Sequence, residues 1–122
     1  MARIVIVDDN RDAADNLCTW LHMEGHQCAV AYDGVVALYL AASLRPDVVV
    51  LDLGMPVMDG YELTRRIRSE SWGRLVHVVA LTGLGQPADR TRGEQVGIDD
   101  YLLKPAEAAE LLAAIARAGS TR

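Results

Sequence analysis

Positive charge, and lysine above all, is scarce in this chain. Of 122 residues, 17 are acidic and 12 are basic, and Lys104 is the single lysine among the basic ones. An acidic chain is a poor candidate for direct nucleic acid binding, which depends on clustered basic residues. The one small cluster (Arg65, Arg66 and Arg68) lacks the interleaved aromatic residues of single-strand binders, and we interpret it as a solvated helix face.

Long apolar runs and metal-ligand spacings are also missing. No run approaches the roughly 20 apolar residues of a membrane-spanning helix, and no signal peptide precedes the first apolar strand, so we expect a cytoplasmic protein without membrane insertion. Cys18 and Cys28 show no zinc-type spacing and fit small hydrophobic residues of a reducing compartment. His22, His26 and His77 are equally scattered, so we expect none of them to bind metal.

What the chain does have is a regular alternation of short apolar runs with amphipathic stretches of about a dozen residues, which is typical of βα units on a parallel sheet. We predict strands at residues 3–7, 27–31, 47–51, 76–81 and 101–103. We predict helices at residues 10–24, at 35–44, from the N-cap Asp59 onward, within the glycine-rich stretch 83–97, and at 106–118 with Gly119 ending the last.

These elements predict one domain over residues 1–122, with no linker or repeat. The first, third, fourth and fifth strands are nearly continuous apolar runs, as expected where helices cover both faces of a sheet. Right-handed crossovers leave few topologies. We therefore predict a flavodoxin-like, doubly wound (βα)5 fold with strand order 2-1-3-4-5, in which the first and third strands are neighbours at the switch point.

Carboxylates follow two of these neighbouring strands. Asp8 and Asp9 come directly after the first strand, and Asp52 directly after the third. Ligands of open α/β sheets bind at this edge. Three close carboxylates repel one another unless a cation intervenes. Mg²⁺ suits such a site because it takes carboxylate, carbonyl and water ligands, and the backbone carbonyl of Gly54 is best placed to complete the set.

A hydroxyl and an ammonium group follow the other two apolar strands, at Thr82 and Lys104. Asp52, once metal-bound, is a candidate nucleophile toward phosphorus and would form an acyl phosphate. The metal, Lys104 and Thr82 could each then contact one phosphoryl oxygen. Taken singly, Asp9 fits an N-cap, Asp52 and Thr82 fit turn residues, and Lys-Pro fits a surface boundary. The hypothesis depends on their occurring together at one sheet edge.

With these residues the chain resembles the receiver domain of response regulators in two-component signalling, over all of residues 1–122. The resemblance lies in the pair Asp8-Asp9, the segment 51–60 (LDLGMPVMDG), the segment 81–83 (LTG) and the segment 100–105 (DYLLKP). Asp9, Asp52, Thr82 and Lys104 are separated in turn by 43, 30 and 22 residues, which also fits the family.

The resemblance implies a role for each matching residue. Asp52 would be the phospho-acceptor; Asp9, Asp52 and the Gly54 carbonyl would hold Mg²⁺, with Asp8 assisting through water and Mn²⁺ as a substitute ion. Thr82 and Lys104 would bind the phosphoryl group. Tyr101 would be the aromatic switch that turns inward when Thr82 moves, and Lys104-Pro105 would be joined by a cis peptide.

It also implies partners and a mode of action. A histidine kinase or histidine phosphotransfer domain would donate the phosphoryl group, and an unknown downstream protein would read the face of the fourth helix, fifth strand and fifth helix. The chain would be a switch rather than an enzyme, catalysing only its own phosphorylation and dephosphorylation. Residues 81–86 (LTGLGQ) further resemble receivers of hybrid histidine kinases, so the chain fits a domain excised from such a protein.

Gly54 and Leu84 depart from family members with polar side chains at these positions. Since neither can orient a water molecule, we expect slow autodephosphorylation, which the half-life of the phosphorylated form measures. Three alternatives stay open. An aspartate-nucleophile phosphatase would need a second acid at position 54, and a flavodoxin-like nucleotide binder would need a glycine- or serine-rich first loop instead of acidic residues 8–12. A receiver-like scaffold that is never phosphorylated is the third.

Overall fold

The computed structural model describes residues 1–83 and 87–120, which contain one five-stranded parallel sheet. Its strands are β1 (Arg3–Val7), β2 (Gln27–Ala31), β3 (Val48–Asp52), β4 (His77–Thr82) and β5 (Asp100–Leu103). They lie in the order β2-β1-β3-β4-β5. The predicted doubly wound topology is therefore confirmed, with β1 and β3 paired at the switch point.

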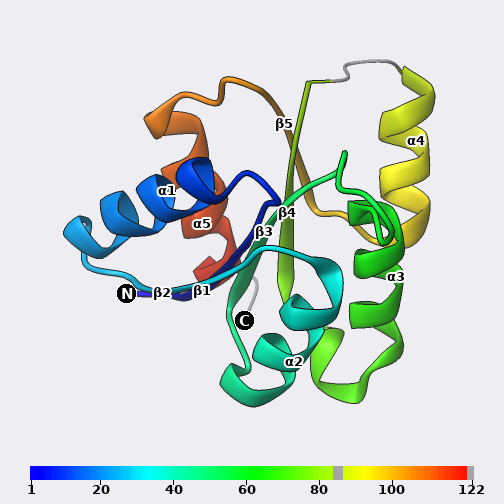
Figure 1. Cartoon of the computed structure of the whole chain (residues 1–122), viewed down its shortest axis with the longest axis horizontal. Helices are drawn as coiled ribbons and strands as arrows, with labels where there is room; N and C mark the ends of the chain where they lie inside the picture. Colours follow the sequence, from blue (N-terminus) through cyan, green and yellow to red (C-terminus); the bar gives the residue numbers. More distant parts are fainter. Residues whose placement is uncertain (84–86, 121–122) are drawn as a thin grey trace.

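Helices cover both faces of the sheet (Figure 1). They are α1 (Arg11–Met23), α2 (Gly34–Leu44), α3 (Gly60–Ser69), α4 (Pro87–Val96) and α5 (Ala108–Ser120), with a short 3-10 turn at Ser71–Gly73. Helices α1 and α5 lie on one side, and α2, α3 and α4 on the other. Each side has its own apolar core: Leu21 and Ile115 pack with Ile6 on the first, and Leu63 and Ile67 with Val49 on the second.

Local chemistry explains most helix ends. The Asp59 side chain accepts a hydrogen bond from the Glu62 N–H (2.9 Å), which confirms the predicted N-cap of α3. Gly25 follows α1 with φ of +92°, a conformation that favours glycine. The predicted bounds of α5 are wrong by two residues at each end: Ala106 lies in the irregular segment before the helix, and the helix continues through Gly119. A glycine lowers helix stability by about 1 kcal/mol but does not by itself end a helix.

The arginine cluster divides between two environments. Arg65 and Arg66 are exposed and pair with Glu62, as expected for a solvated helix face. The Arg68 side chain is only 20% exposed, so the solvated interpretation is wrong for this residue. Because each helical residue is turned by about 100° from the last, neighbours in sequence can face opposite environments.

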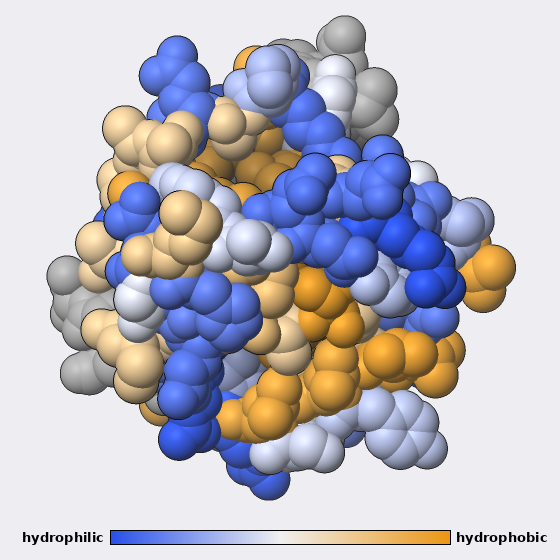
Figure 2. Space-filling model, turned by 60° about the vertical axis from the view of Figure 1, so that its left-hand side comes forward, coloured by the Kyte–Doolittle hydropathy of each residue, from blue (hydrophilic) through white to orange (hydrophobic). Residues whose placement is uncertain are grey.

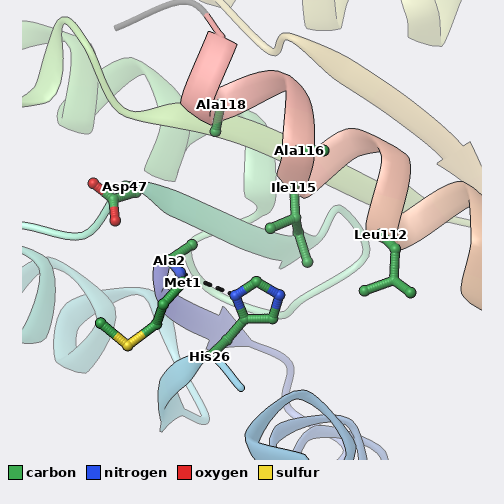
Figure 3. A pocket seen from close by; sticks show the side chains of 8 residues that line it. All are labelled: Met1, Ala2, His26, Asp47, Leu112, Ile115, Ala116 and Ala118. Carbon is green, nitrogen blue, oxygen red and sulfur yellow. Dashed lines mark hydrogen bonds between the residues drawn. The ribbon is translucent and has the colours of Figure 1, made fainter. Parts of the chain in front are cut away.

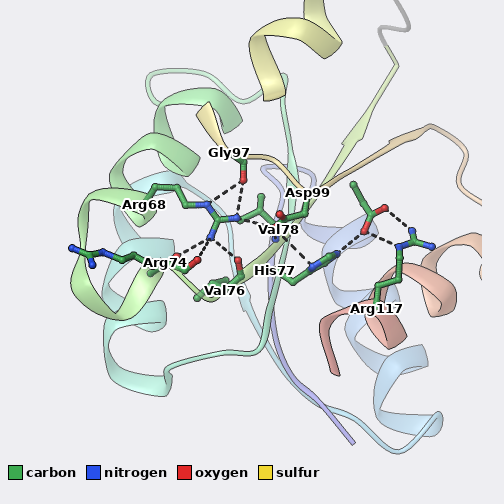
Figure 4. Close-up of polar contacts among 10 residues, drawn as sticks. Arg68, Arg74, Val76, His77, Val78, Gly97, Asp99 and Arg117 are labelled. Atoms are coloured by element: carbon green, nitrogen blue, oxygen red, sulfur yellow. Dashed lines mark hydrogen bonds and ion pairs between the residues drawn. The ribbon is translucent and has the colours of Figure 1, made fainter. Parts of the chain in front are cut away.

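Arg68 ties together the amino ends of β4 and β5 (Figure 4). Its guanidinium donates to the carbonyls of Val76 (2.6 Å) and Gly97 (2.7 Å) and to the Asp99 carboxylate (2.7 Å). The same Asp99 oxygen accepts from the Val78 N–H (2.9 Å). A fork of fixed donors suits this bridging role, which a lysine could not fill with one ammonium.

Asp100 extends this network to α5. Its carboxylate lies 2.5 Å from His77 Nε2 and accepts two hydrogen bonds from Arg117, at 2.5 and 3.2 Å. Burial raises the pKa of the Asp100 carboxyl, but the hydrogen bonds from Arg117 and His77 outweigh burial and hold the pKa below its ordinary value of 3.8. The network thus anchors the strand that carries Tyr101 and leads to Lys104.

Asp100→Asn should lower the free energy of unfolding by about 1–3 kcal/mol at pH 7, because His77 and Arg117 both lose a charged acceptor. A group whose folded pKa is depressed stabilises the protein above its unfolded pKa and loses that contribution as pH falls through the folded pKa. The difference between wild type and variant should therefore be full at neutral pH, begin to shrink near pH 3.8, and disappear only as the pH falls through the lower pKa of the folded state. Urea unfolding across this range measures it.

Glu24→Gln, at the exposed end of α1, is the control and should change stability by less than about 0.5 kcal/mol at every pH. Equal stability of Asp100→Asn and wild type at pH 7 would show that the Asp100 contacts contribute nothing.

Candidate functional site

Three carboxylates meet at the carboxyl edge of the sheet. Asp8 and Asp9 follow β1, and Asp52 is the last residue of β3. The parallel register pairs Val7 with Leu51, which sets the two strand ends side by side. Each of the three residues offers an oxygen, and these oxygens all lie within 4.8 Å of one another. The structure therefore brings together the acids that the sequence placed at this edge.

Asp8 is the most buried of the three, with 7% of its surface exposed. Burial raises the pKa of its carboxyl, and the nearby Asp52 charge acts in the same direction. The Asn10 N–H, which donates to Asp8 at 3.0 Å, and the Lys104 ammonium oppose the rise without cancelling it. A second negative charge is thus costly here, which favours a cation at the site.

Lys104 supplies one positive charge at this edge. Its Nζ lies 3.3 Å from Asp52 Oδ2 and 3.8 Å from Asp8 Oδ2. Its backbone N–H donates to the Thr82 carbonyl (2.7 Å), and the Lys104–Pro105 peptide bond is cis. Thr82 ends β4 and is 2% exposed. The Lys104 side chain is 39% exposed, so its ammonium reaches the carboxylates from the solvent side of the site.

The loop after β3 orients the Asp52 carboxylate. The Gly54 N–H donates to Asp52 Oδ1 (3.0 Å), which leaves Oδ2 toward Lys104. Gly60 lies so close that a Cβ there would be 2.9 Å from the Asp52 carbonyl oxygen, so a glycine is needed for this approach. Metal binding by the Gly54 carbonyl stays a prediction, and Leu84 lies outside the described residues.

Tyr101 is held by residues that the sequence did not suggest. Its hydroxyl lies 3.1 Å from the hydroxyl of Tyr61, at the start of α3. On α4, Arg90 stands over the Tyr101 ring at 5.7 Å, and a Cβ on Gly93 would lie 3.1 Å from that ring. Tyr61 shows no motif of its own and its partner is 40 residues away, so no sequence signal could have identified it.

A separate hollow of about 570 Å³ lies at the opposite edge of the sheet (Figure 3). Met1, Ala2, His26 and Asp47 line it together with one face of α5. His26 Nδ1 accepts the Ala2 N–H (3.0 Å), so this imidazole fixes the start of the chain. The hollow combines one carboxylate with mostly apolar side chains and lies at the amino ends of β1 and β3, which is not where open α/β sheets bind ligands.

The histidines and cysteines of the described part of the chain lie apart from the three carboxylates. Within residues 1–83 and 87–120, no histidine or cysteine joins the group Asp8, Asp9 and Asp52. Cys18 on α1 and Cys28 on β2 are free and half-buried. Burial, together with the adjacent Cys18 thiol, raises the pKa of Cys28 and so disfavours the thiolate form that reacts. None of the described helices has the length and apolar character needed to cross a membrane.

Comparison with known proteins gives a consistent family match. The model of the response regulator receiver domain matches residues 4–116. The chain is 38% identical over 115 residues to the DNA-binding dual master transcriptional regulator RpaA of Synechocystis and 42% identical over 111 residues to the response regulator MprA of Mycobacterium avium. These matches cover 94% and 91% of the chain but 48% of each relative, so the chain spans about half the length of these curated relatives.

Solved structures agree with the sequence relatives. The chemotaxis protein CheY4 of Vibrio cholerae superposes with a TM-score of 0.91 at 31% identity, covering 97% of this chain and 98% of the other. The receiver domain of the sensor histidine kinase PA1611 from Pseudomonas aeruginosa superposes with a TM-score of 0.87 at 35% identity, again covering 97% and 98%. That structure has a magnesium ion coordinated in its active site cleft.

Proposed function

The chain belongs to the response regulator receiver domains of two-component phosphorelay signalling, and from that premise we propose that Asp52 is the residue that accepts the phosphoryl group. The observation that carries this is the approach of Lys104 Nζ to Asp52 Oδ2 (3.3 Å) beside two further carboxylates. We take residues 1–122 as one such domain, acting in the cytoplasm.

In the proposed transfer an Asp52 oxygen attacks the phosphorus of a phosphohistidine. The new P–O bond forms as the P–N bond breaks, and the imidazole nitrogen keeps the electron pair and takes up a proton. The Gly54 N–H and the Lys104 ammonium support this role because they hold the carboxylate in one orientation. Lys104 and Thr82 are then placed to contact the phosphoryl oxygens, where fixed charge lowers the barrier.

The carboxylate set fits Mg²⁺. Asp9 and Asp52, with the Gly54 carbonyl and with Asp8 through water, would hold the ion, and Mn²⁺ would substitute for it. Bound there, the ion would neutralise the charge that accumulates on the phosphoryl oxygens. The raised pKa of Asp8 supports the assignment, because a buried carboxyl gains most from an added cation.

We propose that phosphorylation is read out through Tyr101. Its ring lies between α3 and α4, so a change of its position would alter the surface formed by α4, β5 and α5. A histidine kinase or phosphotransfer domain would be the donor and another protein the receiver of the signal. The chain would act as a switch and not as an enzyme on other substrates. The phosphatase alternative lacks support because residue 54 is a glycine.

Phosphorylation with acetyl phosphate tests this function against a non-phosphorylated scaffold. With Mg²⁺ present, intact mass should rise by one phosphoryl group, and EDTA should reduce the rate by at least about a hundredfold, because the clustered carboxylates would then repel the anion. Mn²⁺ should restore it. No mass gain with Mg²⁺, from either acetyl phosphate or a phosphorylated histidine kinase, would favour the scaffold.

A further inference from the structure

Helix α2 presents an apolar surface to solvent. Between Gly34 and Leu44 its sequence has no charged residue. Ala37 and Ala41 are buried against the sheet, yet Val35, Val36 and Tyr39 on the outer side are 54%, 44% and 75% exposed. A helix that is apolar all round is normally buried on all sides. The outer side of α2 therefore lacks the charged residues of a helix that faces water.

The apolar surface extends beyond the helix. Val57, in the loop after β3, is fully exposed, and with Val35, Pro56 and Met58 it lines a hollow of about 310 Å³. At the other end of α2, Leu44 is 40% exposed. Figure 2 shows an apolar band low on the side of the molecule where α2 lies. Contiguous exposed apolar surface of this kind marks a site of protein interaction.

The exposed residues Val35, Val36, Tyr39, Ala42 and Ser43 form an outer stripe along α2. The two ends of this stripe are complementary in charge and size. Asp33 caps the start of α2 and Arg45 its end, so opposite charges flank the uncharged helix. Bulky Val35 and Val36 stand at the first end, and small Ala42 and Ser43 are exposed at the second. We propose that α2 binds α2 of a second copy of this chain in antiparallel orientation, as an isologous dimer.

Antiparallel pairing satisfies every feature of the stripe at once. It sets Asp33 of each copy near Arg45 of the other and valines against small residues, with Tyr39 near the two-fold axis. Parallel pairing would instead oppose like charges and crowd the valines. Two chains of net charge −5 repel each other, so an uncharged stripe is where they can approach. One helix face buries less than a standard interface of about 1,200 Å², so the dimer is a weak one.

The Asp33–Arg45 pairing lies at the rim of the interface, so it sets the orientation of the two helices more than their affinity.

The dimer also borders the acidic edge. Gly34 packs against Met58 so closely that a Cβ at position 34 would lie 2.6 Å from Met58 Sδ, which connects α2 to the loop after Asp52. Pairing of α2 nevertheless requires no phosphorylation, so its test is independent of the proposed function.

Sedimentation velocity of the 122-residue chain over a wide concentration range tests the dimer. The chain should shift from monomer to dimer with rising concentration, and Tyr39→Glu should weaken dimerisation by at least tenfold. Leu75→Glu, at an apolar residue 69% exposed elsewhere, is the matched control and should dimerise like wild type. Circular dichroism checks that each variant is folded. A monomer at the highest concentration reached, or a Tyr39→Glu dimer as strong as wild type, overturns the proposal.

Cysteine cross-linking tests the orientation. In chains with Cys18→Ala and Cys28→Ala, a Val36→Cys copy is mixed with a Ser43→Cys copy under oxidised glutathione. The cross-link from position 36 to position 43 should exceed the cross-link between two positions 36 by at least tenfold. Equal amounts, or an excess of the second product, overturn the antiparallel arrangement.

Discussion

Asp52→Asn should abolish phosphorylation of this chain. The substitution keeps size and one acceptor oxygen for the Gly54 N–H, which lies 3.0 Å from Oδ1, but removes the negative charge that attacks phosphorus. With acetyl phosphate and Mg²⁺, intact mass should show one phosphoryl group on wild type and none on the variant. Because loss of a covalent nucleophile leaves no alternative path, we expect the rate to fall to background.

The other carboxylates provide the control. Asp12→Asn, at an exposed position in the first turn of α1, should be phosphorylated at the wild-type rate. Asp9→Asn should slow phosphorylation and raise the Mg²⁺ concentration needed, without eliminating the acceptor. A phosphoryl group retained by Asp52→Asn, with peptide mapping to another residue, would show that the acceptor is misassigned.

Lys104→Arg should impair signalling although it preserves charge. The Lys104 ammonium lies between Asp52 Oδ2 and Asp8 Oδ2, at 3.3 and 3.8 Å. The guanidinium is wider and planar, and it cannot present the same compact charge in that space. We expect the response of Tyr101 and α4 to phosphorylation to fall by on the order of tenfold or more. Hydrogen exchange of residues 87–96, with and without beryllofluoride, measures this response.

Arg66→Lys is the converse control, because Arg66 is exposed and pairs with Glu62 on the surface of α3. It should respond to beryllofluoride like wild type. An unchanged response of Tyr101 and α4 in Lys104→Arg would show that any cation suffices at this position, and that the single lysine of the chain carries no special role.

Much of the candidate site could be predicted from sequence because it depends on strand ends. Apolar runs locate the strands, and parallel strands carry their last residues to one edge. The meeting of Asp8, Asp9 and Asp52 follows from this rule and from the pairing of β1 with β3. The approach of Lys104 to Asp52 follows in the same way, since β3, β4 and β5 are successive neighbours in the sheet.

The failures occurred where packing between distant segments decides the environment. Arg68 belongs to a cluster of arginines whose pattern predicts a solvated helix face. In the structure its guanidinium instead donates to the carbonyls of Val76 and Gly97 and to the Asp99 carboxylate. The contact of Tyr61 with Tyr101 likewise joins α3 to β5. Neither feature has a local pattern, because its partners lie many residues away.

By itself the sequence determined the order of the strands, the edge at which the polar residues collect and the chemistry they can perform, since periodicity and strand ends are local properties. Only the tertiary structure decided how buried each group is, and with it the raised pKa of Asp8 and the lowered pKa of Asp100. It also decided that the outer side of α2 stays exposed, because exposure depends on which other elements pack there.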